Sequence, residues 1–292
     1  MITCVGNPVY DYIETPYYKT ENRILSGCST NACIVMRKLS MKTILVGDVG
    51  RDFIEDFKKN MKELQVEYYI KECKESGGFS LKYFNNGDRE LKILGIAGEI
   101  DSFPEKILKS EVIVLAPILQ EINFDLNELR EKFRGIIFLD PQGFLRYVEN
   151  GKILRKKNPE IEKIVSLCDI VKPNEYEAEI MTGINPRKNY KRALEILYSW
   201  GCKIAIITLA EKGSVIFDGE EFVEIPPYTT KLIDPTGAGD TYAGGFIFEY
   251  LKKKDIYEAG LFASCTASIM VENIGKIPVN EEEVRKRVET LK

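Results

Sequence analysis

The stretch IDPTGAGDT, residues 233–241, decides how this sequence is interpreted. Asp234 and Asp240 bracket residues with almost no side chain, just before the apolar segment Tyr242–Leu251, which predicts a helix. Small residues leave backbone N–H groups exposed, and the first N–H groups of a helix have no partner within it. Together these features predict an anion site. Asp240 would stand beside the bound anion, where a carboxylate is repelled unless chemistry or a cation requires it.

Phosphoryl transfer explains this arrangement, because the attacking hydroxyl loses a proton while nearby donors and a metal hold negative charge. Backbone N–H groups of Gly237, Ala238 and Gly239 would bind the phosphate, and Asp240 would accept the proton. The alternative for Asp240 is an aspartate that only caps the helix. Two other glycine-rich sites do not fit. A dinucleotide fingerprint needs a third glycine where Tyr242 stands, and no P-loop motif occurs.

Composition indicates an ordinary globular protein. The chain has 292 residues, of which 44% are hydrophobic and 29% are charged. A net charge of −4, with no long basic run, argues against nucleic acid or an anionic membrane as partner. No apolar stretch approaches the ~20 residues of a membrane span, and the chain opens directly on a strand-like run rather than a signal peptide. We therefore expect a cytoplasmic protein.

Cysteine and histidine usage narrows the possible chemistry. The seven cysteines are scattered, odd in number and never spaced as Cys-x-x-Cys, which predicts reduced thiols. The chain contains no histidine, so Ser-His-Asp and Cys-His catalysis and histidine-ligated metals are excluded. Carboxylates, lysines and backbone dipoles remain to carry out any reaction.

Short β-rich runs alternate with amphipathic segments along most of the chain. This alternation predicts an α/β fold with an open parallel sheet flanked by helices. The predicted strands are Ile2–Gly6, Thr43–Gly47, Val112–Leu115, Ile136–Leu139, Asp169–Val171 and Ile204–Thr208. The predicted helices are Thr30–Leu39, Phe53–Leu64, Leu126–Phe133, Ile161–Leu167, Tyr190–Trp200 and a mostly helical region from Ala238 to the amphipathic tail Asn280–Lys292.

One region interrupts the alternation. Phe79–Phe84 and Arg89–Leu94 flank Asn85-Asn86-Gly87-Asp88 and predict a hairpin, since Asn-Gly adopts the positive φ of a tight turn. Such a hairpin would project from the sheet as a lid; the alternative is an edge hairpin with no part in binding. We expect a single domain spanning 1–292, with a discontinuous β lid inserted at about 13–26 and 73–98.

Two further motifs favour a phosphate site. Asn174 and Glu177 lie three residues apart at a helix start, and so on one face, where they can hold hydrated Mg²⁺ near phosphates. The alternative is a capping arrangement around Asn174. The strand that ends at Thr208 and turns at Gly213 is typical of the ligand edge of an open α/β sheet.

The N-terminal half offers candidates for the acceptor. Asp11 comes just after the first strand, and Asn31 stands at a helix start after Gly27. Asp11 as a turn residue and Asn31 as a helix cap are the alternatives. Asp140 ends a predicted core strand and therefore points toward the ligand edge.

Over nearly its whole length the chain resembles the ribokinase/PfkB family of carbohydrate kinases, through Asp-x-Thr-Gly-Ala-Gly-Asp at 234–240 and Asn-x-x-Glu at 174–177. The resemblance implies a ribokinase-like fold, with Asp240 as the catalytic base and Gly237–Gly239 as the anion hole. It implies that Asn174 and Glu177 serve Mg²⁺ and phosphate, that Asn174, Thr208, Gly213 and Thr236 bind the nucleotide, and that Asp11, Gly27, Asn31 and Asp140 bind the acceptor.

The resemblance also implies ATP and Mg²⁺ as cofactors, and it allows a monovalent cation and a homodimer formed through the lid. The usual Gly-Gly is Gly27-Cys28 here, and the usual Thr-Leu-Gly is Thr208-Leu209-Ala210. Residues 115–119 and 139–146 are most similar to the myo-inositol kinase-like branch. Within the second stretch, Arg146 could equally be a solvated helix residue.

We therefore expect a kinase for a neutral polyol or sugar, of the myo-inositol kind. The stretches 6–11 and 27–31 contain no basic residue that would hold a phosphorylated acceptor. The alternatives are a nucleoside or sugar-phosphate kinase of the same family, or a catalytically idle regulator that binds nucleotide.

Overall fold

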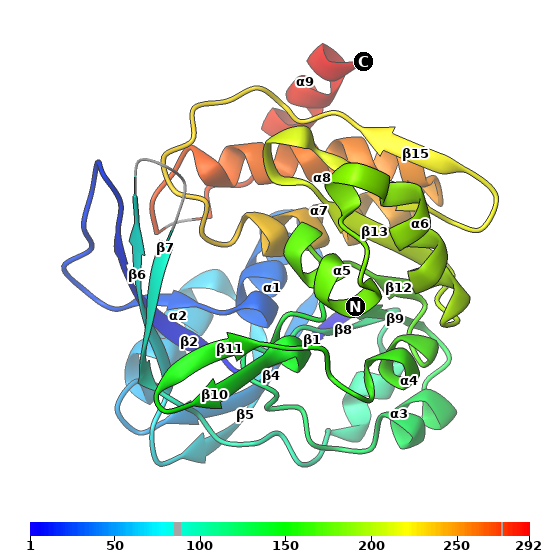
Figure 1. Ribbon diagram of the computed structural model, residues 1–292. Helices are drawn as coiled ribbons and strands as arrows, with labels where there is room; N and C mark the ends of the chain where they lie inside the picture. Colours follow the sequence, from blue (N-terminus) through cyan, green and yellow to red (C-terminus); the bar gives the residue numbers. More distant parts are fainter. Residues whose placement is uncertain (85–88, 276) are drawn as a thin grey trace.

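The computed structural model describes residues 1–84, 89–275 and 277–292. A large sheet runs through the molecule with helices on both faces, and a smaller sheet stands beside it (Figure 1). The predicted α/β fold is thus confirmed. The predicted turn at Asn85–Asp88 lies outside the described residues.

The large sheet has nine strands in the order β15-β14-β13-β12-β9-β8-β1-β4-β5. In that order their bounds are Phe222–Ile225, Ser214–Phe217, Ile204–Thr208, Ile170–Val171, Ile136–Leu139, Val112–Leu115, Ile2–Val5, Thr43–Gly50 and Glu67–Cys73. All pairs from β13 to β5 are parallel, whereas β14 and β15 pair antiparallel at one edge. The sequence analysis did not predict β14, β15 or β5. The turn at Gly213, where φ is 81°, is too short for a parallel crossover, so the sheet is mixed rather than parallel throughout.

Successive residues of the central strands face opposite sides of the sheet, so each face has its own apolar core. Cys4 packs in one core and Val5 in the other. The first core lies under α1 (Cys28–Lys38), α2 (Ile54–Leu64), α7 (Ala238–Lys253), α8 (Ile256–Val271) and α9 (Glu281–Leu291). The second lies under η1 (Glu105–Lys109), α3 (Leu126–Lys132), α4 (Ile161–Ser166), α5 (Glu175–Thr182) and α6 (Pro186–Ser199).

Among the described residues, neither disulfides nor membrane-spanning helices contribute to this fold. All seven cysteines are free thiols, as predicted, and all except Cys73 are buried. In the part of the chain that the structure describes, no helix is both long enough and apolar enough to span a bilayer.

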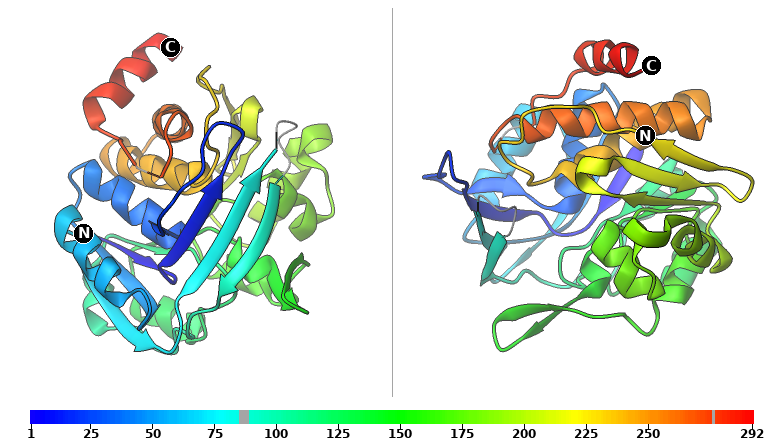
Figure 2. Two further views of the ribbon diagram at one scale, coloured as in Figure 1. Left: turned by 90° about the vertical axis from the view of Figure 1, so that its left-hand side faces the viewer. Right: turned by 45° about the horizontal axis from the view of Figure 1, so that its top comes forward.

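The smaller sheet has four strands in the order β3-β2-β6-β7. Their bounds are Ile24–Ser26, Val9–Glu14, Gly77–Tyr83 and Arg89–Gly95. The predicted hairpin strands, β6 and β7, do pair antiparallel, and β2 joins β6 in parallel. Segments near residues 9–26 and 77–95, far apart in the sequence, therefore stand side by side (Figure 2).

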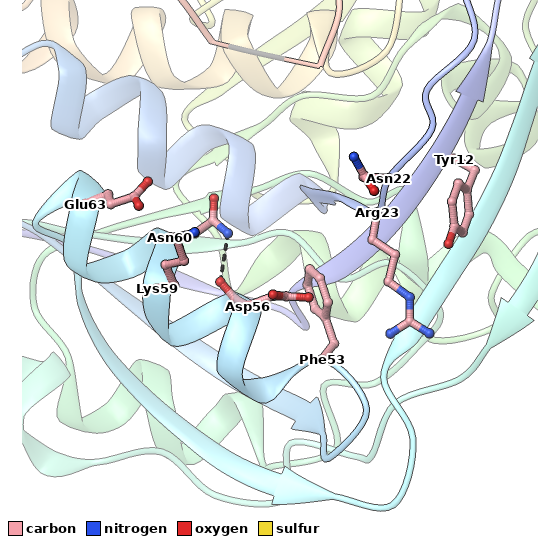
Figure 3. A pocket seen from close by; sticks show the side chains of 8 residues that line it. All are labelled: Tyr12, Asn22, Arg23, Phe53, Asp56, Lys59, Asn60 and Glu63. Atoms are coloured by element: carbon pink, nitrogen blue, oxygen red, sulfur yellow. Dashed lines mark hydrogen bonds between the residues drawn. The ribbon is translucent and has the colours of Figure 1, made fainter.

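A hollow of about 440 Å³ lies where the smaller sheet meets α2 (Figure 3). Tyr12 of β2 and Arg23, which comes just before β3, line it on one side, and Asp56 and Lys59 of α2 line it on the other. None of the candidate site residues from the sequence lines this hollow.

A third sheet, of two strands, corrects the alternative in which Arg146 was a solvated helix residue. Strands β10 (Arg146–Glu149) and β11 (Lys152–Arg155) form an antiparallel hairpin. Its turn passes through Asn150 and Gly151, both at positive φ. The short turn η2 (Gly143–Leu145) leads into this hairpin, and Arg146 is buried at its first position. Arg146 is therefore neither helical nor solvated.

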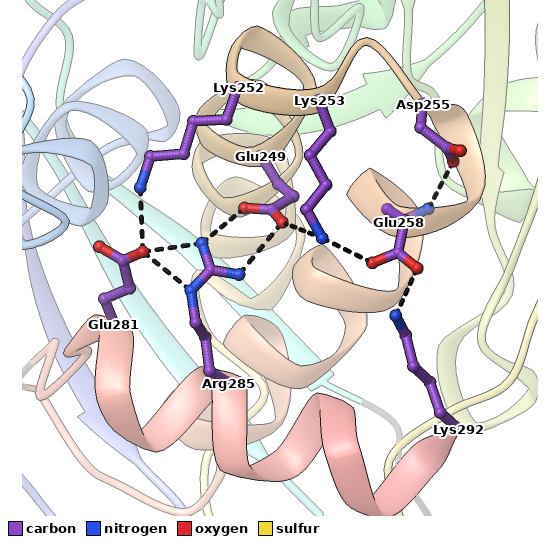
Figure 4. Close-up of polar contacts among 8 residues, drawn as sticks. All are labelled: Glu249, Lys252, Lys253, Asp255, Glu258, Glu281, Arg285 and Lys292. Atoms are coloured by element: carbon purple, nitrogen blue, oxygen red, sulfur yellow. Dashed lines mark hydrogen bonds and ion pairs between the residues drawn. The ribbon is translucent and has the colours of Figure 1, made fainter.

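Ion pairs attach the C-terminal helix α9 to α7 (Figure 4). Glu249 of α7 is only 1% exposed, and both of its carboxylate oxygens accept hydrogen bonds from Arg285 of α9, at 3.1 and 2.9 Å. Lys253 contacts the same carboxylate at 3.1 Å. A buried carboxylate needs such partners to stay ionised, so α9 contributes the main partner of an otherwise costly charge.

We expect Arg285→Met to destabilise the protein by about 1–3 kcal/mol, because Glu249 would keep only Lys253 as a charged partner. Lys286→Met is the matched control, since it removes the same charge from α9 at an exposed pair with Glu282. Its effect should stay within about 0.5 kcal/mol. Urea unfolding of both variants decides; equal midpoints would contradict this role for Arg285.

Candidate functional site

The carboxyl ends of the parallel strands form one edge of the large sheet, and the candidate residues gather there. Leu139 of β9 pairs with Val171 of β12, so Asp140 and Lys172 leave the sheet side by side. Nζ of Lys172 lies 2.9 Å from Oδ2 of Asp140, and Lys172 is only 2% exposed. A buried ion pair thus forms at the ligand edge of the sheet.

Lys172 is a site residue that the sequence analysis did not assign. A side-chain carbon added to Gly239 would stand 3.5 Å from Nζ of Lys172, so this cation faces the predicted anion hole. Burial by itself would lower the pKa of Lys172, but the charge of Asp140 and the hydrogen bond to it raise that pKa overall. The signal available in the sequence was the position of Lys172, directly after a strand and two residues before Asn174.

The predicted anion hole lies at the start of a helix, but its available donors differ from the predicted set, because the N–H of Ala238 donates to the carbonyl of Pro235 at 3.3 Å. Helix α7 begins after Gly237, which has φ 76°, and Thr241 N–H donates to the carbonyl of Gly237 at 2.8 Å. Within the described residues, no recorded hydrogen bond uses the N–H of Gly239 or of Asp240. These two donors stand at the positive end of a 16-residue helix, as an anion requires.

Asp240 is not a helix cap. The cap position of α7 is Gly237, and no side chain caps it. Instead, the carboxylate of Asp240 accepts a hydrogen bond of 2.8 Å from the amide of Asn31. Burial, followed by the nearby charge of Asp140, raises the pKa of Asp240, while the bond from Asn31 opposes this shift. Asn31 is not a cap either, because α1 is capped at Gly27.

Asp11 lies within strand β2 rather than in a turn, and it is 4% exposed. Burial raises the pKa of Asp11 to about 7; a bond from Ser26 and the charge of Arg146 oppose the shift, and the charge of Asp240 adds to it. Among the described residues, Oδ1 of Asp11 has no hydrogen-bond partner. Buried polar atoms are nearly always paired, so this oxygen is available to a partner that the described chain does not supply.

Gln142 and Cys28 complete the same region, and the sequence analysis assigned neither of them to the site. Nε2 of Gln142 donates to Sγ of Cys28 at 2.8 Å, and the backbone N–H of Gln142 donates to Asp140 at 3.2 Å. Gly27 comes just before Cys28 with φ 118°, and a side-chain carbon there would lie 2.9 Å from the carbonyl of Asn7. Gly27 therefore shapes the backbone rather than presenting a side chain.

Asn174 and Glu177 form the capping arrangement that was the alternative in the sequence analysis. The Asn174 side chain accepts from the N–H groups of Tyr176 and Glu177, and Glu177 Oε2 accepts from the N–H of Asn174. Burial, with the charge of Asp140, raises the pKa of Glu177. The described residues include no cluster of three or more His, Cys, Asp or Glu that could bind a metal by itself. Hydrated Mg²⁺ needs only one or two carboxylates plus phosphates, and the second oxygen of Glu177 lies outside the cap and fits that requirement.

The candidate nucleotide residues are less tightly grouped. Thr208 forms a bridge with Asn174 across neighbouring strand ends. Thr236 shares a hydrogen bond of 2.9 Å with the Tyr83 hydroxyl of the smaller sheet. Within the described residues, Gly213 makes no hydrogen bond to the site carboxylates Asp140 and Asp240. Its two neighbours, Lys212 and Ser214, help to line a cavity of about 440 Å³.

Several known proteins are similar to this chain in sequence and in architecture. Residues 144–283 match the pfkB family carbohydrate kinases. The cytidine kinase of Thermococcus kodakarensis is 31% identical over 241 residues, which cover 80% of this chain and 81% of that protein. This chain belongs to the pfkB family of carbohydrate kinases.

Two further comparisons bear on the activity of this kinase. The nucleoside kinase of Methanothermobacter thermautotrophicus is 26% identical over 308 residues, which cover 98% of this chain and 94% of that protein. A pyrophosphate-dependent kinase of the ribokinase family, solved with a pyrophosphate analog and myo-inositol, superimposes with a TM-score of 0.81 at 25% identity, covering 99% of this chain and 100% of that one. The protein is therefore a ribokinase-like sugar or nucleoside kinase, a phosphotransferase with an alcohol as acceptor.

The raised pKa of Asp11 has a testable effect on stability. Its folded value of about 7 exceeds the ~3.9 of an unfolded aspartate, so its stabilising contribution is complete below about pH 4 and is lost as the pH rises through 7. We expect Asp11→Asn to become more stable relative to wild type across this window, by at most about 1.4 kcal/mol per pH unit. Unfolding free energies of both proteins from pH 4.5 to 8 give the answer; a difference independent of pH would contradict it.

Proposed function

We propose that this kinase transfers a phosphoryl group from ATP to a ring hydroxyl of a compact neutral polyol, of the myo-inositol kind. The observation that carries the proposal is the buried Asp11, whose Oδ1 lacks a partner in a site that also contains Arg146 and Asp240. An unpaired carboxylate oxygen suits a hydroxyl, which can donate to it while accepting from a neighbouring cation.

The charges around the acceptor position support a neutral substrate. The charge of Arg146 lowers the pKa of Asp11, and the same charge also lowers the pKa of Glu177 and of Cys28. A phosphorylated acceptor would need paired cationic groups to hold its phosphate. Here Asp11 and Asp240 would instead repel that phosphate, so Arg146 is better matched to hydroxyl oxygens than to a dianion.

Comparisons supply a competing proposal. Two relatives are named cytidine kinase and nucleoside kinase, whereas a structural neighbour was solved with myo-inositol. A nucleobase needs an apolar or aromatic surface to stack on. The groups assembled here are charged or hydrogen-bonding: Asp11, Gln142 and Arg146. This composition favours the polyol over the nucleoside.

The proposed mechanism follows from the geometry. Asp240, held by Asn31, takes the proton from the attacking hydroxyl. The N–H groups of Gly239 and Asp240, together with Lys172, stabilise the charge on the transferred phosphoryl group. Mg²⁺ would be held near the phosphates by Glu177 and would neutralise their charge.

Two further parts of the proposal concern the surroundings of the anion hole. Asp234 is fully buried, and its Oδ2 has no partner among the described residues, which supports a monovalent cation bound beside it. The smaller sheet would act as the lid, because Tyr83 at the end of β6 reaches Thr236, next to the anion hole.

An acceptor and donor screen tests the proposed function. We expect myo-inositol with ATP to give a kcat/KM at least tenfold above cytidine, ribose or fructose 6-phosphate, a difference of about 1.4 kcal/mol. Pyrophosphate replaces ATP in a parallel series, since a structural neighbour is pyrophosphate-dependent. A higher kcat/KM for cytidine would instead support a nucleoside kinase. A higher kcat/KM for fructose 6-phosphate would show that cationic groups bind the acceptor phosphate, which would contradict the proposal.

Asp240→Asn should reduce kcat by at least about a hundredfold, because it removes the base but keeps the size of the side chain. Binding of ATP, measured by calorimetry, should stay within a few fold of wild type. Asp218→Asn serves as control, since Asp218 lies at the far end of β14 and its carboxylate only accepts from a turn. Retention of most of the kcat in Asp240→Asn would exclude this residue as the base.

A further inference from the structure

Cys28 occupies the position where the family resemblance has the second glycine of a Gly-Gly pair. It is the first residue of α1, it is 5% exposed, and Gly27 before it lies at a φ that places the helix start against the acceptor region. Its Sγ accepts from Nε2 of Gln142 at 2.8 Å. The thiol also lies close enough to Asp240 for the charge of that carboxylate to contribute to the raised pKa of Cys28, after burial.

The thiol thus stands between a proposed acceptor-binding group and the proposed base. Burial raises the pKa of Cys28 well above its usual range, so the group stays a neutral S–H. In that form the sulfur accepts from the Gln142 amide, and its S–H remains available to donate on the side of Asp240. A glycine in its place would leave the space between Gln142 and Asp240 open and would remove the hydrogen bond from Gln142.

We propose that Cys28 determines acceptor specificity: its side chain fills the space between Gln142 and Asp240, excludes acceptors with an extra substituent there, and positions the Gln142 amide toward the polyol. The inference rests on the proposed function, because it assigns Cys28 to the acceptor side of that same site. A second, independent observation supports a ligand here, since the buried Asp11 Oδ1 lacks a partner in the same region.

The test compares myo-inositol with its mono-O-methyl ethers in wild type, Cys28→Gly, Cys28→Ala and Cys28→Ser. One additional carbon in a fitted pocket changes kcat/KM by about 10- to 200-fold. We expect wild type to reject at least one ether by about that factor, and Cys28→Gly to reduce this discrimination by about tenfold or more. Cys28→Ser should retain it, since serine restores a hydrogen-bonding group of similar size.

A positioning role should also separate KM from kcat. Without the bond from Gln142 to the side chain at position 28, KM for myo-inositol should rise by about tenfold in Cys28→Gly and Cys28→Ala while kcat changes less. Cys28→Ser should recover the KM. Cys33→Ala is the matched control, because Cys33 is fully buried on the same helix, whereas the contact with Gln142 belongs to Cys28. This variant should leave the KM for myo-inositol and the discrimination against the ethers unchanged.

Unchanged discrimination in both Cys28→Gly and Cys28→Ala would overturn the inference, as would an equal change in Cys33→Ala. If Cys28→Gly fails to fold, the thermal unfolding curve shows this, and Cys28→Ala carries the comparison. Absence of polyol phosphorylation by wild type would instead refute the proposed function. The same variants, assayed with the acceptor that wins the screen and its O-methyl ether, would then test Cys28 separately.

Discussion

The buried pair between Lys172 and Asp140 is the interaction on which the candidate site depends. Asp140, Glu177 and Asp240 approach one another at the carboxyl edge of the sheet, and mutual repulsion together with burial raises the pKa of Glu177 and of Asp240. Lys172 is the cation whose charge opposes both shifts. Without it, the pKa of Glu177 and that of Asp240 would rise further, and a protonated Asp240 cannot accept the proton of a hydroxyl.

The position of this pair follows from the sheet. Parallel pairing of β9 with β12 places Asp140 next to Lys172, and the start of α7 brings Gly239 up to the lysine. A substrate phosphate at the N-terminus of α7 would therefore meet a backbone N–H array on one side and an ammonium group on the other. One buried region thus contains both the negatively charged candidate base, Asp240, and the positively charged Lys172 beside the proposed phosphate position.

Other features of the molecule serve to hold the site rather than to form it. The capping box at Asn174 fixes the first turn of α5, so the same side chains that were predicted to bind Mg²⁺ also build the helix start. Gly27 permits the backbone approach that brings Cys28 and Asn31 to α7. A structural role thus coexists with a proposed ligand role in single residues, which is why spacing in the sequence could not separate the two.

Much of the fold was predictable, because it depends on local patterns. Short continuous apolar runs predicted β1, β8, β9 and β13 within a residue, since a strand buried on both faces is apolar throughout. The Gly237–Asp240 motif predicted a helix start, where α7 does begin, because small residues and a helix start act locally; the anion hole there stays a proposal. The strands β10 and β11 were missed, since a short hairpin around Asn150-Gly151 has little apolar alternation.

The sequence by itself determined the α/β class, the helix start at the anion hole and the candidate base Asp240, because each depends on residues close together in the chain. Only the tertiary structure decided that Lys172 faces Gly239, that Gln142 reaches Cys28, and that Arg146 lies buried near Asp11. These contacts join residues that stand 67, 114 and 135 positions apart in the chain. No local pattern encodes such a contact, because it arises only when parallel strands align their ends and the smaller sheet lies against that edge.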